Sequence, residues 1–223
     1  MTIILSFIQK LKILIEYLIF NSFSERKYFN SRKSKIKVVV DVGSNLGSYI
    51  KFLLKTFNDV KIYSIEPNIE LLNKQKKMFK NYSNISYHQC AITNLTGKMN
   101  FYLRNINSHS SLDEIHPESE INNLVNIIQV NTLTLEDFMK INKIEKIDLL
   151  KVDTEGNEVK ILESMSNLLK NGKITYLKIE ISNNNLIEIF NFLKDFKFEI
   201  IGISNLYHKF NKLRLFDLFI KFT

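Results

Sequence analysis

The sequence predicts an α/β fold, in which a largely parallel sheet is covered by helices on both faces. The first observation is an alternation of short apolar runs with helical stretches from residue 36 onward. The second is a glycine-bearing turn at residues 43–47, between the first apolar run and the first helix of this series. The third is that the last two strand-like runs have no helix between them, which predicts an antiparallel pair at the carboxyl end.

Short apolar runs predict the strands, and apolar residues at helical spacing predict the helices. In chain order, the expected strands lie at residues 37–42, 60–65, 85–91, 98–104, 127–132, 147–152, 174–181, 198–203 and 213–222. The expected helices lie at residues 46–57, 68–79, 134–141, 159–169 and 186–195. The first strand is rich in β-branched residues, and the strand at 147–152 is apolar enough to be buried. The second helix places Leu71, Leu72 and Phe79 on one face. Residues 105–127 are irregular and polar, which is typical of a loop that covers a substrate.

Composition places the chain among ordinary globular proteins. Its 223 residues are 45% hydrophobic and 24% charged, which excludes a disordered chain. A single cysteine excludes an intrachain disulfide and a cysteine-rich zinc site, and it favours a reducing compartment. The formal charge of +8 is concentrated in residues 1–37, which hold eight basic and only two acidic residues. The rest of the chain is nearly neutral, so we expect no strong nucleic-acid binding.

We expect an N-terminal appendage at residues 1–35 and the main domain at residues 36–223. Apolar residues recur at helical spacing within residues 3–20, with charged residues between them, and a polar, basic connector follows. This stretch is too short and too charged for a membrane span, and it lacks the early basic residue and cleavage site of a signal peptide. Either the helix docks on the domain, or it lies on an anionic membrane surface. The expected location is cytoplasmic, which in the second case means peripheral at the inner membrane face.

The sharpest motif is V-V-V-D-V-G-S-N-L-G at residues 38–47, where an apolar strand enters a turn that opens a helix. Gly43 permits a tight bend, and Gly47 lets strand, helix and ligand approach closely. A dinucleotide fingerprint needs a third glycine, and a phosphate-binding loop needs Gly-Lys-Ser/Thr, so neither is present. Asp41 at the strand end would repel a pyrophosphate, and it favours a cationic group such as an amine.

Glu66 ends the second expected strand, 19 residues after Gly47, and Pro67 follows it at the start of the next helix. An acid at this position can accept hydrogen bonds from both hydroxyls of a ribose. Together with Asp41, it predicts a pocket for a nucleoside that carries a positively charged amino-acid tail. S-adenosylmethionine is such a molecule, and we expect it to be the cofactor.

A second acidic run, D-T-E-G-N-E at residues 153–158, follows the buried strand. It places Asp153 and Glu155 where strand gives way to helix, beside the expected cofactor pocket. The alternative is that these acids only cap the helix and complement its dipole. Gly156 is unfavourable in a first helical turn unless something must approach it closely, which favours a functional site.

These motifs together resemble the FkbM family of S-adenosylmethionine-dependent methyltransferases. The matching segments are V-V-V-D-V-G-S-N-L-G at 38–47, I-E-P-N at 65–68 and I-D-L-L-K-V-D-T-E-G-N-E at 147–158. Weaker agreement comes from A-I at 91–92, Gly97, S-S-L at 110–112 and K-I-E-I at 178–181. The resemblance runs from about residue 36 to residue 222, and Thr154 departs from the apolar residue that the family usually has there.

The resemblance implies a Rossmann-like, seven-strand class I methyltransferase sheet. It also implies methylation of a hydroxyl oxygen on a sugar, a glycan or another small-molecule natural product. The residues expected to bind the cofactor are Asp41, Gly43, Ser44, Asn45, Gly47, Glu66, Pro67 and Ala91.

Methyl transfer to a hydroxyl requires alignment of the reacting atoms and a base that takes the hydroxyl proton. We expect Asp153 to be that base, with Glu155 as the second choice. Glu180, at the end of the next strand, could orient the substrate or hold a divalent ion with Asp153, but two oxygen ligands are too few to claim a metal. Three further candidates for substrate contact lie in the irregular segment: His109, Ser110 and Ser111.

Two alternatives stay open, an RNA ribose methyltransferase and a membrane-associated protein that binds S-adenosylmethionine without catalysis. Methylation of base amines is disfavoured because its proline-rich loop is absent; Pro67 and Pro117 are the only prolines. Cytosine C5 methylation needs a nucleophilic cysteine, and Cys90 lies within a strand with no preceding proline. The intact glycines and acids favour an active enzyme.

Overall fold

The computed structural model of the chain describes residues 24–31, 36–105, 110–114, 124–209 and 212–223. The helix expected at residues 3–20 and the candidate His109 lie outside these residues. No helix within the described ranges is long and apolar enough to cross a membrane.

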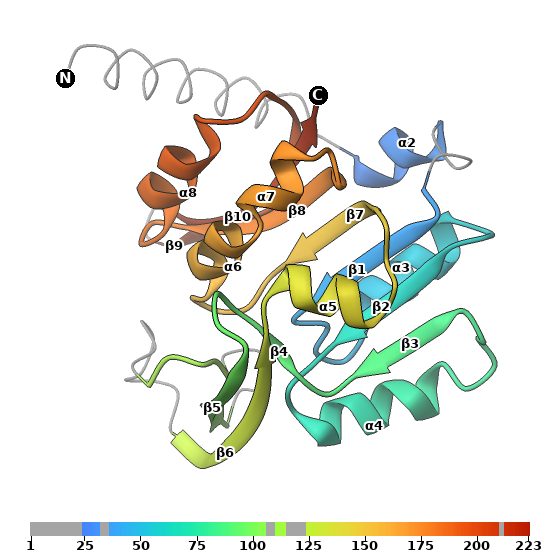
Figure 1. The fold of residues 1–223 in the computed structure, drawn as a ribbon, viewed down its shortest axis with the longest axis vertical. Coiled ribbons are helices and arrows are strands. Elements are labelled where there is room, and N and C mark those ends of the chain that lie inside the picture. Colours follow the sequence, from blue (N-terminus) through green and yellow to red (C-terminus); the bar gives the residue numbers. More distant parts are fainter. Residues whose placement is uncertain (1–23, 32–35, 106–109, 115–123, 210–211) are drawn as a thin grey trace.

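A seven-stranded sheet forms the centre of the molecule (Figure 1). In spatial order its strands are β3 (Ile85–His88), β2 (Lys61–Ile65), β1 (Val38–Val42), β7 (Ile147–Val152), β8 (Ile174–Ser182), β10 (Lys212–Phe222) and β9 (Phe198–Lys209). The first five are parallel, and β10 runs antiparallel to both β8 and β9. The α/β class, the seven-strand sheet and the carboxyl-terminal antiparallel pair are therefore confirmed. The strand order reverses between β1 and β7, which is where open α/β sheets bind ligands.

Helices cover both faces of this sheet, and each face has its own apolar core. One face carries α5 (Leu135–Ile141), α6 (Glu158–Ser164), α7 (Ser166–Lys170) and α8 (Leu186–Leu193). The other carries α2 (Glu25–Asn30), α3 (Ser48–Thr56) and α4 (Ile69–Met78). Successive side chains of β1 point to opposite faces of the sheet and so belong to different cores. Val40 packs with α5 to α8, and Val39 packs with α2 and α3.

A second, three-stranded sheet lies beside the first and was not predicted as a separate unit. It consists of β4 (Ala91–Ile92), β6 (Leu124–Leu133) and β5 (Gly97–Arg104), in that spatial order. The single strand expected at 85–91 is in fact divided, because β3 ends at His88 and β4 belongs to the other sheet. Ser111 forms a bridge to Tyr102 of β5, so this sheet also anchors part of the segment predicted as irregular.

The segment expected to be a polar connector contains the short helix α2, whose N-cap is Ser24. Phe29 of this helix is 0% exposed. Its ring packs edge-to-face against the rings of Phe57, Tyr176 and Phe219, with centroid separations of 5.5, 5.6 and 5.3 Å. A six-residue helix with one buried side chain produces no periodic pattern, which explains why the sequence did not reveal it.

Candidate active site

A cavity of about 770 Å³ lies at the carboxyl ends of the central strands. That size is typical of a small-molecule site. Its walls come from the turns after β1 and β2, the second sheet, the turn after β7, and residues of α2, α3, β8 and β10. The cavity therefore coincides with the place where the strand order reverses.

The turn after β1 depends on its two glycines. Gly43 has a φ of +75°, and a Cβ atom there would lie 1.8 Å from the carbonyl oxygen of Asp153. Gly47 has a φ of +81°, and its Cβ would lie 2.6 Å from the ring of Phe79. Gly43 thus lets the turn after β1 lie directly against Asp153 in the turn after β7. Gly47 leaves space for the ring of Phe79. Ser44 and Asn45 of this turn, two of the residues predicted to bind the cofactor, line the cavity.

Glu66 stands at the end of β2 and lines the cavity, although it is only 5% exposed. Its Oε2 accepts a hydrogen bond from the backbone N–H of Asn45, and its Oε1 accepts one from Asn68, both at 2.9 Å. Burial raises the pKa of Glu66 to about 7, against the opposing effect of these two hydrogen bonds. Pro67 and Ala91 line the same cavity, so the structure brings these three predicted cofactor residues together.

Asp41 is fully buried, and its closest charged partner is a lysine that sequence analysis did not single out. The Nζ atom of Lys151 lies 3.3 Å from Asp41, 3.2 Å from Asp153 and 2.9 Å from the carbonyl oxygen of Gly43. Burial raises the pKa of Asp41 despite Lys151. Burial also acts to lower the pKa of Lys151, but Asp153 and Asp41 outweigh it and hold that pKa above its ordinary value. Lys151 lines the cavity, so the group that meets a ligand here is an ammonium.

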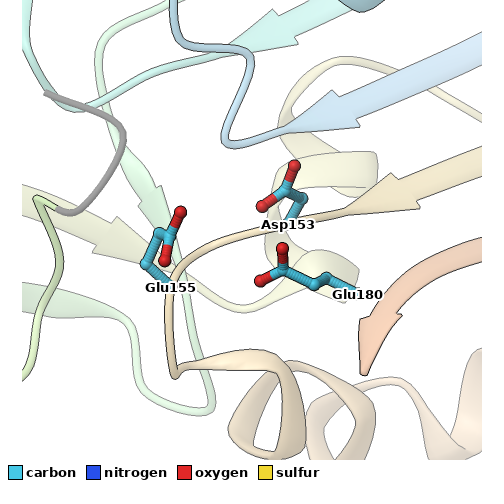
Figure 2. Close-up of side chains that lie close together, drawn as sticks. All are labelled: Asp153, Glu155 and Glu180. Carbon is cyan, nitrogen blue, oxygen red and sulfur yellow. The ribbon is translucent and has the colours of Figure 1, made fainter. Parts of the chain in front are cut away.

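Three carboxylates converge at the end of β7, as Figure 2 shows. Asp153 follows β7, Glu155 lies in the next turn with a φ of +58°, and Glu180 lies on β8. One oxygen from each lies within 4.8 Å of the others. Burial raises the pKa of Glu180 to about 9, and the charges of Asp153 and Glu155 add to that effect. Its surroundings thus favour the protonated form of Glu180, while Asp153 is paired with Lys151.

This group of three is also the set of side chains that could hold a metal ion among the described residues. Carboxylate oxygens suit hard cations such as Mg²⁺ and Ca²⁺. Sequence analysis identified each of the three acids, but it did not predict that Glu155 would join the other two.

The turn after β7 is built by a buried acid, Glu158. Its carboxylate accepts hydrogen bonds from the backbone N–H of Thr154 at 2.8 Å, from the Thr154 hydroxyl at 2.9 Å and from the N–H of Gly156 at 3.1 Å. The expectation that Gly156 lies in a first helical turn is wrong, because α6 begins only at Glu158. With a φ of +119°, Gly156 shapes the turn that presents the acids.

The second sheet supplies another wall of the cavity. Phe101, Ser110 and Leu112 line it, and the Ser110 hydroxyl also accepts a hydrogen bond from the backbone N–H of Arg104 at 3.0 Å. Ser111 is buried, and its hydroxyl bonds to the carbonyl oxygen of Asp113. The structure thus places Ser110 at the cavity, where it was predicted, and Ser111 in the packing behind it.

The opposite end of the cavity holds four residues that sequence analysis missed, here called the Lys178 cluster: Glu25, Tyr49, Lys178 and Asp217. The Nζ atom of Lys178 lies 3.1 Å from Glu25 and 3.0 Å from Asp217. Tyr49 donates a hydrogen bond to Glu25, and its ring centroid lies 4.6 Å from that Nζ. The sequence did contain a signal for this cluster. Lys178 and Asp217 are charged residues within apolar strands, and a buried charged residue needs a partner.

Comparison with known proteins gives a consistent result. A family model described as the methyltransferase FkbM domain matches residues 41–200. A protein of the fungus Beauveria bassiana named Methyltransferase 1 is 25% identical over 143 residues. That alignment covers 57% of this chain and 57% of the fungal protein, so the chain spans little more than half of that relative.

Solved structures share the fold at low sequence identity. An rRNA methylase from Streptococcus thermophilus superposes with a TM-score of 0.52 and 12% identity, covering 88% of this chain and 93% of its own. A Streptococcus mutans protein in complex with SAH gives a TM-score of 0.52 and 12% identity, covering 90% of this chain and 99% of its own. The likeness confirms a methyltransferase-type sheet.

Proposed function

The chain belongs to the FkbM methyltransferase family, and we propose that it transfers a methyl group from S-adenosylmethionine to a hydroxyl oxygen of a sugar, glycan or other small molecule. The observation that carries this proposal is the presence of two differently placed acids in one cavity. Glu66 ends β2, where an acid can receive ribose hydroxyls. Asp153 follows β7, where a carboxylate can receive the proton of an acceptor hydroxyl.

The residues around Glu66 fit the adenosine part of the donor. Each carboxylate oxygen of Glu66 accepts one backbone hydrogen bond, which leaves each with capacity for another. Pro67, Ala91 and Ile92 add apolar surface at the same end of the cavity, which suits the face of a base. When bound, S-adenosylmethionine supplies a methyl group on a positively charged sulfur, and that charge makes the methyl group electrophilic.

The chain's own residues then have two tasks, which are to orient the acceptor and to remove its proton. Orientation in the cavity supplies much of the rate enhancement, because the reacting atoms are held in line. The O–H bond of the acceptor breaks toward an Oδ atom of Asp153, so the proton rests on that carboxyl group and the oxygen keeps its electron pair. Lys151 positions Asp153 through the 3.2 Å ion pair. Glu155, in the same cluster, is the second candidate for the proton.

The test is transfer of tritiated methyl groups from S-adenosylmethionine by the full chain and by Asp153→Asn. The acceptors are a set of neutral methyl glycosides and, for comparison, a ribosomal RNA transcript. We expect transfer to a glycoside, and we expect Asp153→Asn to lower kcat by about 100-fold or more. The affinity for S-adenosylhomocysteine should stay within about threefold, because the glutamate at the ribose position is intact.

A matched control is Asp59→Asn, since Asp59 forms an exposed ion pair with Lys37 outside the cavity. This variant should behave as the unaltered chain. Transfer to RNA alone would instead identify a ribose methyltransferase. Full turnover in Asp153→Asn would remove Asp153 as the base. Binding of S-adenosylhomocysteine with no transfer to any acceptor would favour a binding protein without catalysis.

A further inference from the structure

The Lys178 cluster occupies the wall of the cavity farthest along the sheet from Glu66. Glu25 comes from α2, Tyr49 from α3, Lys178 from β8 and Asp217 from β10. In the register of the sheet, Lys178 is the direct neighbour of Lys151, and Lys151 is the direct neighbour of Asp41. Lys178 therefore continues the row of buried charged residues that Asp41 and Lys151 begin.

The three charged members of the cluster are deeply buried yet line a cavity. The side chain of Lys178 is 8% exposed, that of Glu25 is 11% exposed and that of Asp217 is 10% exposed. A buried ion cluster loses hydration, and well-packed apolar residues in its place are often equally stable or more stable. The stability of the fold therefore does not explain why this cavity wall is charged, whereas contact with a polar ligand does.

Two members of the cluster lie outside the part of the chain that the family model matches. That match covers residues 41–200, which contain the Glu66 end and the acidic turn. Glu25 precedes it and Asp217 follows it. The methyl donor is the shared reactant, and the matched segment contains the residues expected to bind it. The acceptor is the variable reactant, so a subsite that includes residues outside the matched segment is suited to the acceptor.

The chemistry of the wall favours a neutral ligand with several hydroxyl groups. Glu25 and Asp217 offer carboxylate oxygens that accept hydrogen bonds from hydroxyls, and the Lys178 ammonium is a donor. The three together carry a net charge of −1, so a phosphate or carboxylate on the ligand would be repelled. Tyr49 and Phe52 also line the cavity, with their rings stacked at a centroid separation of 5.4 Å, and add apolar surface for the C–H face of a ring.

From this arrangement we propose that the Lys178 cluster is the acceptor subsite, and that it binds a neutral sugar ring and rejects its phosphorylated forms. The proposal rests on the proposed function, since it names the substrate class of the same cavity. The hydroxyl to be methylated then lies toward Asp153, and the other hydroxyls of the ring contact Glu25, Lys178 and Asp217.

The experiment is a binding titration by saturation-transfer NMR on the full chain saturated with S-adenosylhomocysteine. The probes are the methyl α-glycosides of glucose, galactose, mannose and rhamnose, and the matching sugar 1-phosphates. We expect at least one glycoside to bind, and its 1-phosphate to bind about tenfold more weakly or not at all. Asp217→Asn and Lys178→Met should each weaken glycoside binding by about tenfold or more.

Tyr49→Phe keeps the ring and its packing, so it tests the cluster without a risk to folding. It removes the hydroxyl that fixes Glu25, and we expect glycoside affinity to fall by about threefold or more. In all three variants the affinity for S-adenosylhomocysteine should change by less than about threefold. Asp59→Asn, which alters an exposed ion pair, is the control for both ligands.

The outcomes separate this inference from the proposed function. If the chain does not bind S-adenosylhomocysteine, the proposed function fails. If it binds S-adenosylhomocysteine but none of the glycosides, or binds the 1-phosphates equally well, the acceptor subsite is overturned. A loss of S-adenosylhomocysteine affinity in the cluster variants that matches the loss of glycoside affinity also overturns it, because the cluster would then serve the donor.

Discussion

Glu66 is a carboxyl group whose protonation changes within the physiological pH range. Its burial raises the pKa from 4.5 to about 7. Because the pKa is higher in the folded chain, the protonated form of Glu66 favours folding. That contribution is fully present below the unfolded pKa and is lost as the pH rises through about 7. Under the proposed function, donor binding has the opposite preference, since a carboxylate accepts hydrogen bonds from ribose hydroxyls only through its free lone pairs, which are most available in the ionised form.

We therefore expect the affinity for S-adenosylhomocysteine to fall by about tenfold between pH 8 and pH 6. Isothermal titration calorimetry at several pH values in this range measures the effect. In Glu66→Gln the group can no longer titrate, so affinity should be weaker and nearly independent of pH. An equally steep pH dependence in Glu66→Gln would show that another group is responsible.

Lys151 is the cation that pairs with the acids at the carboxyl ends of β1 and β7. It contacts Asp41, Asp153 and the backbone of the first turn, all within 3.3 Å. Removal of this ammonium leaves the fully buried Asp41 carboxylate without its cation. Such broken buried pairs are strongly destabilising, whereas exposed pairs contribute little.

Lys151→Met should lower the free energy of unfolding by about 3–5 kcal/mol in a urea titration. Lys37→Met, which removes an exposed ion pair with Asp59, is the matched control and should have no comparable effect. The double variant Asp41→Asn with Lys151→Met should recover part of the loss, because the unpaired carboxylate is gone. A double variant less stable than Lys151→Met alone would contradict the pairing.

Helix α2 extends the domain beyond the boundary expected at residue 36. Phe29 fixes it to the sheet, and Glu25 reaches the cavity. Phe29→Ala should lower the free energy of unfolding by about 3–5 kcal/mol, because it leaves a cavity among packed aromatic rings. Ile187→Ala, on the exposed surface of α8, is the control and should change stability by less than about 0.5 kcal/mol. Equal effects of the two substitutions would mean that α2 does not pack as described.

The elements show which parts of the fold a single sequence could predict. Strands such as β1 and β7 were placed within a residue, because buried parallel strands are continuous apolar runs. The separation of β3 from β4 was missed, since the pattern of apolar residues does not reveal which sheet a strand joins. Helix α2 was missed because one buried side chain gives no period.

The same distinction applies to the candidate site. Asp153 and Glu66 were predicted because an acid after an apolar strand has a known position at the sheet edge. The Lys178 cluster joins residues from both ends of the chain, and only the strand order brings Lys178 next to Asp217. Lys151 was missed for a different reason: a lysine in a buried strand signals a partner, but the sequence does not say which acid that partner is.

At the level of the whole molecule, the cavity is acidic although the chain as a whole is basic. The chain carries a formal charge of +8. The cavity is lined by four carboxylates besides Glu66, and by two ammonium groups. They are Glu25, Asp153, Glu155 and Asp217, with Lys151 and Lys178. An acidic cavity favours neutral or cationic ligands inside, which suits a donor whose sulfur is positively charged.

The central claim, a methyl-donor site at the carboxyl ends of β1, β2 and β7, is tested most directly by calorimetric titration of the full chain with S-adenosylmethionine. We expect one site per chain with a Kd on the order of 1–100 μM. We also expect Glu66→Ala and Asp41→Ala each to weaken binding by about tenfold or more, the first by loss of the ribose acceptor and the second by loss of the partner that holds Lys151. An absence of binding at about 1 mM ligand, with the chain folded, would contradict it.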